Sequence, residues 1–440
     1  GPDGAYEAVF VPPEIRDHLP TPSNEGSTFS LQPAPAPSMV ISGDNLLLDD
    51  ACTLLAYVHN YRPELSLDQG WPASHKRRLE RRLRDGDPAR FAFLSHLVYQ
   101  AGLLLVQEDK STRLPPEAVT EWLQSDTTVQ RRATVTTWRD DPSWNDLFHV
   151  PTLQPEDTGA WQNDPLLPRQ TVLRHLRACT PMSWYKIEEF VSAIKEIDPD
   201  FQRPSGDYAS WYIRDEQTGA YLSGFENWDN VEGRLIRYLL TRPMSWLGLV
   251  DLGKMEKEQP AHVFRLSEEG AAYIGLSNPP PPSSSPPARL RPGFRVVVPA
   301  PRRYARFQLN RVADWVQSGE RFVYRLTPSS LDRARQQSIP MTRVIDFLEK
   351  IIEAPLPESL EQALDRWDTH GTEVHLESTI LLRLSTADLM DQILGSSHLD
   401  KLFGERVGPR AVLIHRHDWP EVIVQLEAIG LLPELKDLPE

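Results

Sequence analysis

The sequence predicts a mixed α+β protein that is mainly α-helical and built from more than one domain. Three observations lead to this prediction. Apolar residues recur with helical spacing through most of the chain, short apolar runs of strand length follow groups of helices, and prolines collect in two segments that can separate folded parts. A chain of 440 residues also has the length of roughly two to four domains.

The composition excludes several classes of protein. Apolar residues make up 40% of the chain and charged residues 25%, as in ordinary globular proteins, so a wholly disordered, collagen-like or membrane-embedded chain is not expected. Two cysteines, Cys52 and Cys179, cannot supply a disulfide framework, which favours a reducing compartment. No apolar run reaches the ~18 residues of a membrane span, and we expect no signal sequence, because the first residues given have neither a basic region nor an apolar core. We expect a cytoplasmic protein, and this expectation is compatible with association with the nucleoid.

The 40 prolines set the expected domain boundaries, because their share of the chain is about twice the ~5% norm. One cluster lies in an acidic N-terminal stretch with little apolar material, so residues 1–45 are predicted to be an acidic, proline-rich arm. The second includes NPPPPSSSPP at 278–287, which cannot enter a helix or sheet interior. Residues 278–290 are therefore predicted to be a linker.

The first body after the arm shows a particular order of elements. Apolar stripes predict helices over residues 46–58 and 89–101, with the basic run HKRRLERRLR at 75–84 as a helix between them. Two short strands follow, at 102–106 and up to residue 114, separated by a polar turn. Three helices and then two strands are the order of a winged helix, so residues 46–150 are predicted to form one winged-helix-like unit.

The same order returns in the next stretch. Helical stripes lie near residues 172–176, 187–194 and 231–239, and two strands follow at 246–250 and 263–266. Two copies of one order are more informative than either copy alone. Residues 151–277 are therefore predicted to form a second winged-helix-like unit.

The C-terminal body, residues 291–440, has a different pattern. Phe294, Val296 and Val298 alternate as in a strand, a helix is expected to run to about Ser318, and a strong helical face follows at 344–352. Strand-like runs lie at 373–376, 380–384 and 411–415. This mixture of small strands and helices predicts an α+β domain.

Several motifs in the C-terminal body resemble a known family. Their order and spacing resemble the N-terminal domain of XPB-type DNA repair helicases; the motifs are YRLTPSSL at 324–331, IDFLEK at 345–350, PLPESL at 355–360 and GTEVHL at 371–376. The upstream part is similar to bacterial helicase-associated-domain proteins that carry the same C-terminal module, through WNDL at 144–147, DYASWYIR at 207–214, GFENW at 224–228 and WLGLV at 246–250. The resemblance covers most of residues 46–435. It implies recognition of damaged DNA and docking of protein partners.

No pattern in the chain supports catalysis. Residues 248–255 match the phosphate-binding motif G-x-x-x-x-G-K-[ST] except that Met255 replaces the hydroxyl that would hold magnesium. The pair His415 and His417 lacks a second cluster at metal-ligand spacing, and the aspartates at 198, 200 and 207 suit a turn better than a nuclease site. We therefore expect no enzyme, no catalytic residue, no metal site and no cofactor.

Charge is distributed very unevenly. Residues 289–343 hold twelve Arg, no Lys and three acids, a local formal charge of +9, which leaves −24 for the rest of a chain with net charge −15. Clustered arginines suit phosphate. The predicted DNA-binding residues are Arg295, Arg302, Arg303, Arg306, Arg311 and Arg321, with Lys76, Arg77, Arg78, Arg81 and Arg82 on the basic helix. The open alternatives are that some arginines pair with acids elsewhere in the chain, and that the basic helix is an ordinary solvated face.

Other side chains with a nucleic-acid interpretation are expected in the core. Aromatic residues crowd the second unit, where stacking on bases is the alternative to packing. The third helix of each unit is mostly apolar, so we expect it to be buried and not to read the major groove.

Two functions from different classes remain. The first is a non-catalytic, sequence-nonspecific DNA-binding accessory protein for DNA repair, transcription or a helicase machine. Its partners would be double-stranded or distorted duplex DNA and a helicase or nuclease protein, without membrane. The alternative is a protein-interaction scaffold whose winged helices dock a protein partner without direct DNA contact.

Overall fold

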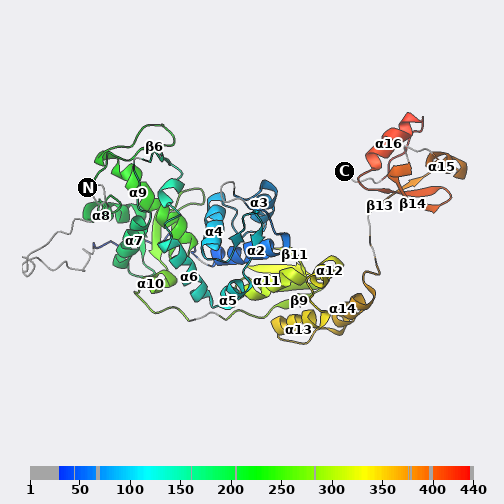
Figure 1. Cartoon of the computed structure of the whole chain (residues 1–440), viewed down its shortest axis with the longest axis horizontal. Coiled ribbons are helices and arrows are strands. Elements are labelled where there is room, and N and C mark those ends of the chain that lie inside the picture. Colours follow the sequence, from blue (N-terminus) through cyan, green and yellow to red (C-terminus); the bar gives the residue numbers. More distant parts are fainter. Residues whose placement is uncertain are drawn as a thin grey trace, which may run out of the picture. The chain divides into compact units, whose positions relative to one another are not determined.

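The computed structural model describes residues 29–43, 45–65, 70–159, 161–203, 206–281, 284–374, 376, 379–395 and 400–436 (Figure 1). The predicted arm lies largely outside these residues. The structure is a mixed helix and strand protein dominated by helices, which confirms the predicted fold class. The chain divides between Glu361 and Gln362 into two compact units. None of the helices in the described ranges is long and apolar enough to cross a membrane.

The first helices of the larger unit surround the buried helix α2, Leu46–Tyr61. Helix α3 spans Ala73–Glu80, and α4 spans Pro88–Gln100 after the N-cap Asp87, whose side chain accepts a hydrogen bond from the Ala89 N–H. The strands β2, Leu105–Val106, and β3, Thr112–Arg113, pair as a hairpin. The order of three helices and two strands is as predicted. Helices α5, Pro116–Gln124, and α6, Thr127–Asp140, follow.

The next part of the larger unit contains a four-stranded antiparallel sheet with strand order β1-β7-β8-β5. Its strands are β1 Met39–Ile41, β5 Trp184–Lys186, β7 Val250–Lys254 and β8 Val263–Leu266, and its helices are α7 Leu166–His175, α8 Ile187–Ile197, α9 Trp228–Leu239 and α10 Glu268–Tyr273. Strands β4, Leu153–Pro155, and β6, Ile213–Asp215, form a separate pair. The predicted arm therefore ends before residue 39, because residues 39–41 pair with β7.

The last part of the larger unit is a four-stranded antiparallel sheet of order β11-β12-β10-β9 with helices. The elements are β9 Arg289–Arg291, β10 Arg295–Pro299, α11 Arg303–Val312, β11 Asp314–Gln317, β12 Arg321–Arg325, α12 Pro328–Gln336 and α13 Met341–Ile352. Val296, Val298, Phe322 and Tyr324 form the buried face of the sheet. The helix expected to reach Ser318 ends at Val312 instead, because the residues after it pair with β12.

The predicted linker does not separate two independent bodies. Helix α11, which follows it, packs against α2, which lies far earlier in the chain (Figure 1). The Asn310 side-chain amide donates to the Ala56 carbonyl at 2.9 Å, and that of Asn60 donates to the Asn310 carbonyl at 2.7 Å. Phe307 belongs to the same apolar core as α2. Prolines mark an extended connection, but they do not prevent the segments on either side from packing together.

Helix α14, Glu358–His370, crosses the division, and the smaller unit beyond it has its own sheet of order β13-β15-β14. Its elements are β13 Thr379–Arg383, α15 Ala387–Leu394, β14 Phe403–Gly408, β15 Ala411–His415 and α16 Trp419–Ala428. A small core contains Ile393, Ile414, Val422 and Leu426. Of the three strands expected here, that at 373–376 is not formed by its described residues 373, 374 and 376. Short helical turns complete the fold at Asp146–His149, Leu176–Ala178, Phe225–Asn227, Leu240–Met244 and Asp400–Leu402.

Candidate nucleic-acid interface

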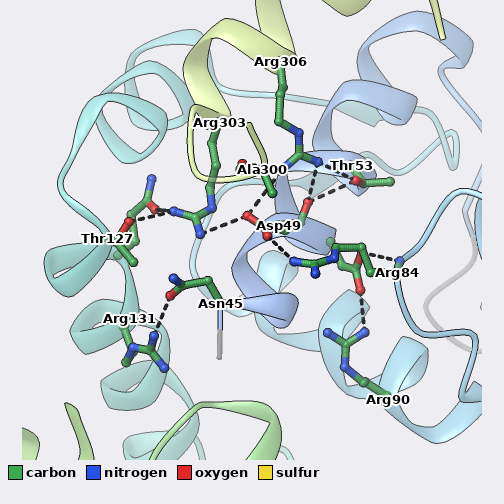
Figure 2. Close-up of polar contacts among 12 residues, drawn as sticks. Asn45, Asp49, Thr53, Arg84, Arg90, Thr127, Arg131, Ala300, Arg303 and Arg306 are labelled. Atoms are coloured by element: carbon green, nitrogen blue, oxygen red, sulfur yellow. Dashed lines mark hydrogen bonds and ion pairs between the residues drawn. The ribbon is translucent and has the colours of Figure 1, made fainter. Parts of the chain in front are cut away.

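Two of the predicted DNA-binding arginines lie inside the protein. Arg303 and Arg306 of α11 are 2% and 1% exposed and point toward Asp49 of α2 (Figure 2). The distances to Asp49 Oδ1 are 3.0 Å from Arg303 Nη2 and 3.4 Å from Arg306 Nη1. Arg306 also donates to the Ala300 carbonyl and the Thr53 hydroxyl, at 2.9 and 3.0 Å. Neither guanidinium can reach phosphate, so the prediction for these two residues is corrected.

The buried arginines belong to a larger polar cluster that joins several helices (Figure 2). Arg84 Nη1 lies 2.8 Å from the second oxygen of Asp49, and Arg90 Nη1 lies 2.5 Å from Asp50 Oδ2. Burial raises the pKa of Asp50, although the charge of Arg90 acts in the opposite direction. Arg303 also donates to the Gln130 side chain of α6 at 2.7 Å. The charge of two arginines of the arginine-rich region, Arg303 and Arg306, is thus partly neutralised by Asp49 of α2, which agrees with the alternative that some arginines pair with acids elsewhere in the chain.

Arg302 and Arg311 are half-buried and hold neighbouring segments. The Arg302 guanidinium lies 2.7 Å from a Glu353 carboxylate oxygen and donates to the Ile351 carbonyl at 3.2 Å. Arg302 therefore joins the start of α11 to the end of α13. Arg311 donates to the side-chain oxygens of Gln337 and Gln308, both at 3.0 Å.

The remaining two predicted arginines of this region lie on an exposed sheet face. In the strand register, Arg295 of β10 is directly opposite Arg291 of β9 on one side and Arg325 of β12 on the other. Directly opposed residues share a face, and so do residues two positions apart on one strand. Arg321 is opposite Pro299 and Arg289 is opposite Val297, both on the strand of Arg295. We call the resulting surface the arginine face; it consists of Arg289, Arg291, Arg295, Arg321 and Arg325.

The arginine face carries charge that the protein does not balance. All five side chains are exposed, and none of them forms an ion pair with another residue in the described ranges. Asp314 is opposite Arg325 in β11, but its carboxylate already contacts Arg333 at 3.1 Å and accepts a hydrogen bond from the Thr327 hydroxyl. Like charges directly opposite each other destabilise a sheet. The planar guanidinium group pairs well with phosphate, so this face suits a polyanion.

Sequence reasoning found two of these five arginines and missed Arg289, Arg291 and Arg325. The signal was present in the sequence. Arginines at alternate positions of RLR at 289–291, and at both ends of RFVYR at 321–325, show the two-residue period that places side chains on one face of a strand.

The basic helix α3 divides into free and packed side chains. Arg77, Arg78 and Arg81 are exposed, whereas Lys76 lies 3.9 Å from Glu80. Arg82 lies over aromatic rings, with its guanidinium carbon 5.3 Å from the Tyr61 ring centre and 5.2 Å from that of Trp315. Tyr61 is a residue of α2 and Trp315 is a residue of β11. Arg82, which follows the end of α3, therefore fixes the position of α3 against these two elements. Only the exposed arginines of this helix are free to meet an anion.

The patterns that resemble catalytic sites lie in ordinary structural positions. Residues 250–254 of the near-match form strand β7, which begins four residues later than the strand expected at 246–250, and their backbone groups pair with β1 and β8. Asp207 accepts from the backbone N–H groups of Ala209 and Ser210 and so stabilises a turn. No three His, Cys, Asp or Glu side chains gather as metal ligands within the described ranges. Both cysteines are buried, and burial raises the pKa of the Cys179 thiol to about 12.

Most aromatic side chains of the second predicted unit pack in the core. Trp228 is fully buried, and Trp184 and Tyr238 are nearly so. Trp211 stacks on Trp161 with ring centres 5.0 Å apart. These contacts agree with the packing interpretation.

Comparison with known proteins places the arginine face in a helicase-related domain. Residues 290–408 match the family model described as the helicase conserved C-terminal domain. The match begins within β9 and includes four of the five residues of the arginine face. A search of curated proteins gave no match. The C-terminal part of the chain is therefore similar to a helicase-related domain over residues 290–408.

Proposed function

We propose that this protein is a non-catalytic accessory component of a helicase-related machine that binds duplex DNA through the arginine face. The observation that carries the proposal is the row formed by Arg291, Arg295 and Arg325 across three adjacent strands. Neighbouring strands are about 4.8 Å apart, so the row concentrates three cations within a short distance. A polyanion that covers the row replaces repulsion with charge-assisted hydrogen bonds.

The rest of the structure supports binding without sequence preference. Helix α4 is buried through Phe93, Leu94 and Leu97, and its Arg90 is held by Asp50. On α9, Arg234 pairs with Asp215 and Arg237 with Glu188. The helices that would read base edges are thus turned into the protein or already paired. Contacts to phosphate position a protein on DNA and carry no direct base information.

The secondary structure also supports the winged-helix interpretation. In the second copy, strand β5 lies between α7 and α8 in sequence and pairs with β8 of the β7–β8 hairpin. A winged helix has the order helix, strand, helix, helix, hairpin, and the second copy agrees with it apart from β6, which lies between α8 and α9 and pairs with β4. We infer a scaffold role for these units, since their third helices are buried.

The non-catalytic part of the proposal is supported by the near-match at 248–255. A phosphate-binding loop needs free backbone N–H groups around the phosphates. Here the backbone groups of residues 250–254 pair with strands β1 and β8 of a sheet, so they are not free to surround a phosphate. A chain without a motor of its own would act by holding DNA for a partner.

The test is duplex DNA binding by fluorescence anisotropy with a triple variant, Arg291→Gln, Arg295→Gln and Arg325→Gln, in the full chain. Wild-type affinity should fall steeply between ~50 and ~200 mM salt, and the triple variant should bind more weakly with a shallower salt dependence. Arg177→Gln is the matched control, because it removes an exposed arginine on a helical turn outside the arginine face. Equal affinity and equal salt dependence of wild type and triple variant would refute the proposal.

A protein-docking scaffold is the second candidate, favoured by one feature of the smaller unit. A groove of about 540 Å³ is lined mainly by apolar residues of β13, α16 and the segment after it. Leu381 and Leu432 in its lining are 40% and 94% exposed. If the scaffold is the main function, the triple variant should still co-purify with its protein partner, while groove substitutions such as Leu381→Asp should abolish this co-purification.

A further inference from the structure

A second cationic site lies away from the arginine face, in a cavity of about 610 Å³ within the larger unit. Its walls come from the end of α2, the β2–β3 hairpin, the start of α5 and one side of α11. This volume is typical of pockets for small molecules.

Three separate elements each contribute one arginine to this cavity. Arg62 follows α2, Arg113 is in β3 and Arg311 is in α11, while none of the described lining residues is Asp or Glu. Arg62 and Arg113 are exposed, and in the described part of the chain neither forms an ion pair. In a chain with net charge −15, a cavity lined by three arginines and no carboxylate requires an explanation.

The half-buried Arg311 shows that this charge is not balanced from within. Its hydrogen-bond acceptors are the side-chain amides of Gln308 and Gln337, which carry no charge. The other buried arginines of α11, Arg303 and Arg306, instead share the carboxylate of Asp49. The arginines of one helix therefore have different environments: Arg303 and Arg306 have a carboxylate as counter-ion, and Arg311, which lines the cavity, has none among the described residues.

The pKa of His59 is affected by the same positive environment. Its Nε2 lies 3.2 Å from the Gln337 side-chain oxygen that Arg311 also contacts. Burial lowers the pKa of His59, and the charges of Arg311 and Arg62 lower it further, against the effect of the Gln337 hydrogen bond. The imidazole is thus neutral at pH 7, and the positive potential of the cavity comes from the arginines.

We propose that this cavity binds a phosphate-bearing small molecule of nucleotide size. The three guanidinium groups supply charge-assisted donors for a dianionic phosphate. Val58, Leu114, Val119 and Phe307 supply an apolar surface for the uncharged part of the ligand. Because the walls belong to α2, the β2–β3 hairpin, α5 and α11, the bound ligand holds these elements together and stabilises the folded chain.

Isothermal titration calorimetry and thermal unfolding of the full chain test the proposal, with inorganic phosphate, AMP and adenosine as probes. AMP should bind saturably and raise the melting temperature, inorganic phosphate should bind more weakly, and adenosine should give neither signal. Arg113→Glu and Arg311→Gln should each weaken AMP binding by roughly tenfold or more, as expected for loss of a charge-assisted hydrogen bond. Arg177→Glu is the matched control and should bind AMP like wild type.

The phosphate that binds in this cavity could belong to a free nucleotide or to the DNA backbone, and the experiment distinguishes these two ligands. The triple variant of the arginine face should bind AMP normally, so this site stands or falls independently of the proposed DNA-binding surface. Absence of saturable binding by AMP and phosphate, or unchanged AMP affinity of both Arg113→Glu and Arg311→Gln, would overturn the proposal. Loss of duplex binding in Arg113→Glu without any AMP binding would also overturn it, because the cavity would then serve DNA phosphate.

Discussion

Arg306 of α11 and Asp49 of α2 lie 3.4 Å apart in the protein interior, and each side chain is about 1% exposed. The two residues are 257 positions apart in the sequence, on either side of a proline-rich segment. A buried carboxylate that three arginines approach cannot lose its charge without leaving those arginines uncompensated. This contact therefore makes the fold of the helices around α2 dependent on α11.

The first prediction follows from this dependence. Asp49→Asn should lower the free energy of unfolding by about 3–5 kcal/mol, because it leaves the buried guanidinium groups of Arg303 and Arg306 without their carboxylate. Arg306→Ala should also destabilise the fold, because it removes the donors to Asp49, Ala300 and Thr53, although Asp49 keeps Arg303 and Arg84 as partners. Urea denaturation measures the effect. Asp332→Asn is the control, since its ion pair with Arg335 lies at the surface and exposed pairs contribute at most about 1 kcal/mol. A loss below about 1 kcal/mol in both buried variants would contradict the interpretation of the cluster.

The second prediction concerns the proline-rich segment. A protease site inserted between Asn278 and Ala288 should be cleaved without separating the two fragments, because α11 remains packed against α2. Size-exclusion chromatography should show one species at the size of the intact chain. The Arg306→Ala variant should separate more readily after cleavage. Two independently eluting folded fragments would restore the boundary expected from the sequence.

The local sequence pattern predicted much of the secondary structure but few of the contacts between residues that are far apart in the sequence. The helices α2, α3 and α4 and the β2–β3 hairpin follow from spacing that acts over a few residues. The strand expected at 246–250 is displaced to Val250–Lys254, where pairing with β1 and β8 fixes it. Trp315 and Val316 have apolar spacing that also fits a helix, and only pairing with β12 makes them a strand. In the sequence, Arg303 and Arg306 resemble phosphate ligands. In the structure both form buried ion pairs with Asp49, which is far away in the sequence, so they do not bind phosphate. The arginine face depends on strand register, which composition does not specify.

The third prediction uses the ion pair of Asp215 with Arg234. Hydrogen bonds from Arg234 and from the Thr218 backbone lower the pKa of Asp215 from 3.8 to about 2. In the unfolded chain this carboxylate binds its proton at a higher pH than in the folded chain. The pair therefore stabilises the fold above about pH 4, and this stabilisation is lost as the pH falls toward 2. Asp215→Asn should be less sensitive than wild type to acid between pH 4.5 and 2.5, measured as the change in urea midpoint. Equal acid sensitivity of the two proteins would exclude this assignment.

The fourth prediction concerns catalysis. ATP hydrolysis should stay at background with or without DNA, because Lys254 lies in strand β7 and Met255 offers no hydroxyl to magnesium. A coupled phosphate-release assay measures the rate. Lys254→Ala should behave as wild type in this assay. Turnover that disappears in Lys254→Ala would identify a nucleotide site that the sheet pairing of β7 does not suggest.

The last prediction separates the stability of the arginine face from its function. Arg295 faces Arg291 and Arg325 directly, so Arg295→Gln removes two like-charge contacts at once. Cross-strand pairs contribute about 0.2–1 kcal/mol each, and the variant should be more stable than wild type by about that amount at low salt. Salt screens exposed charges, so the difference should vanish near ~1 M salt. The same variant should bind duplex DNA more weakly. Urea denaturation at two salt concentrations and anisotropy on one preparation measure both effects. A variant that is less stable at low salt, or a stability gain that persists at high salt, would show that Arg295 supports the sheet and is not held there for an anionic partner.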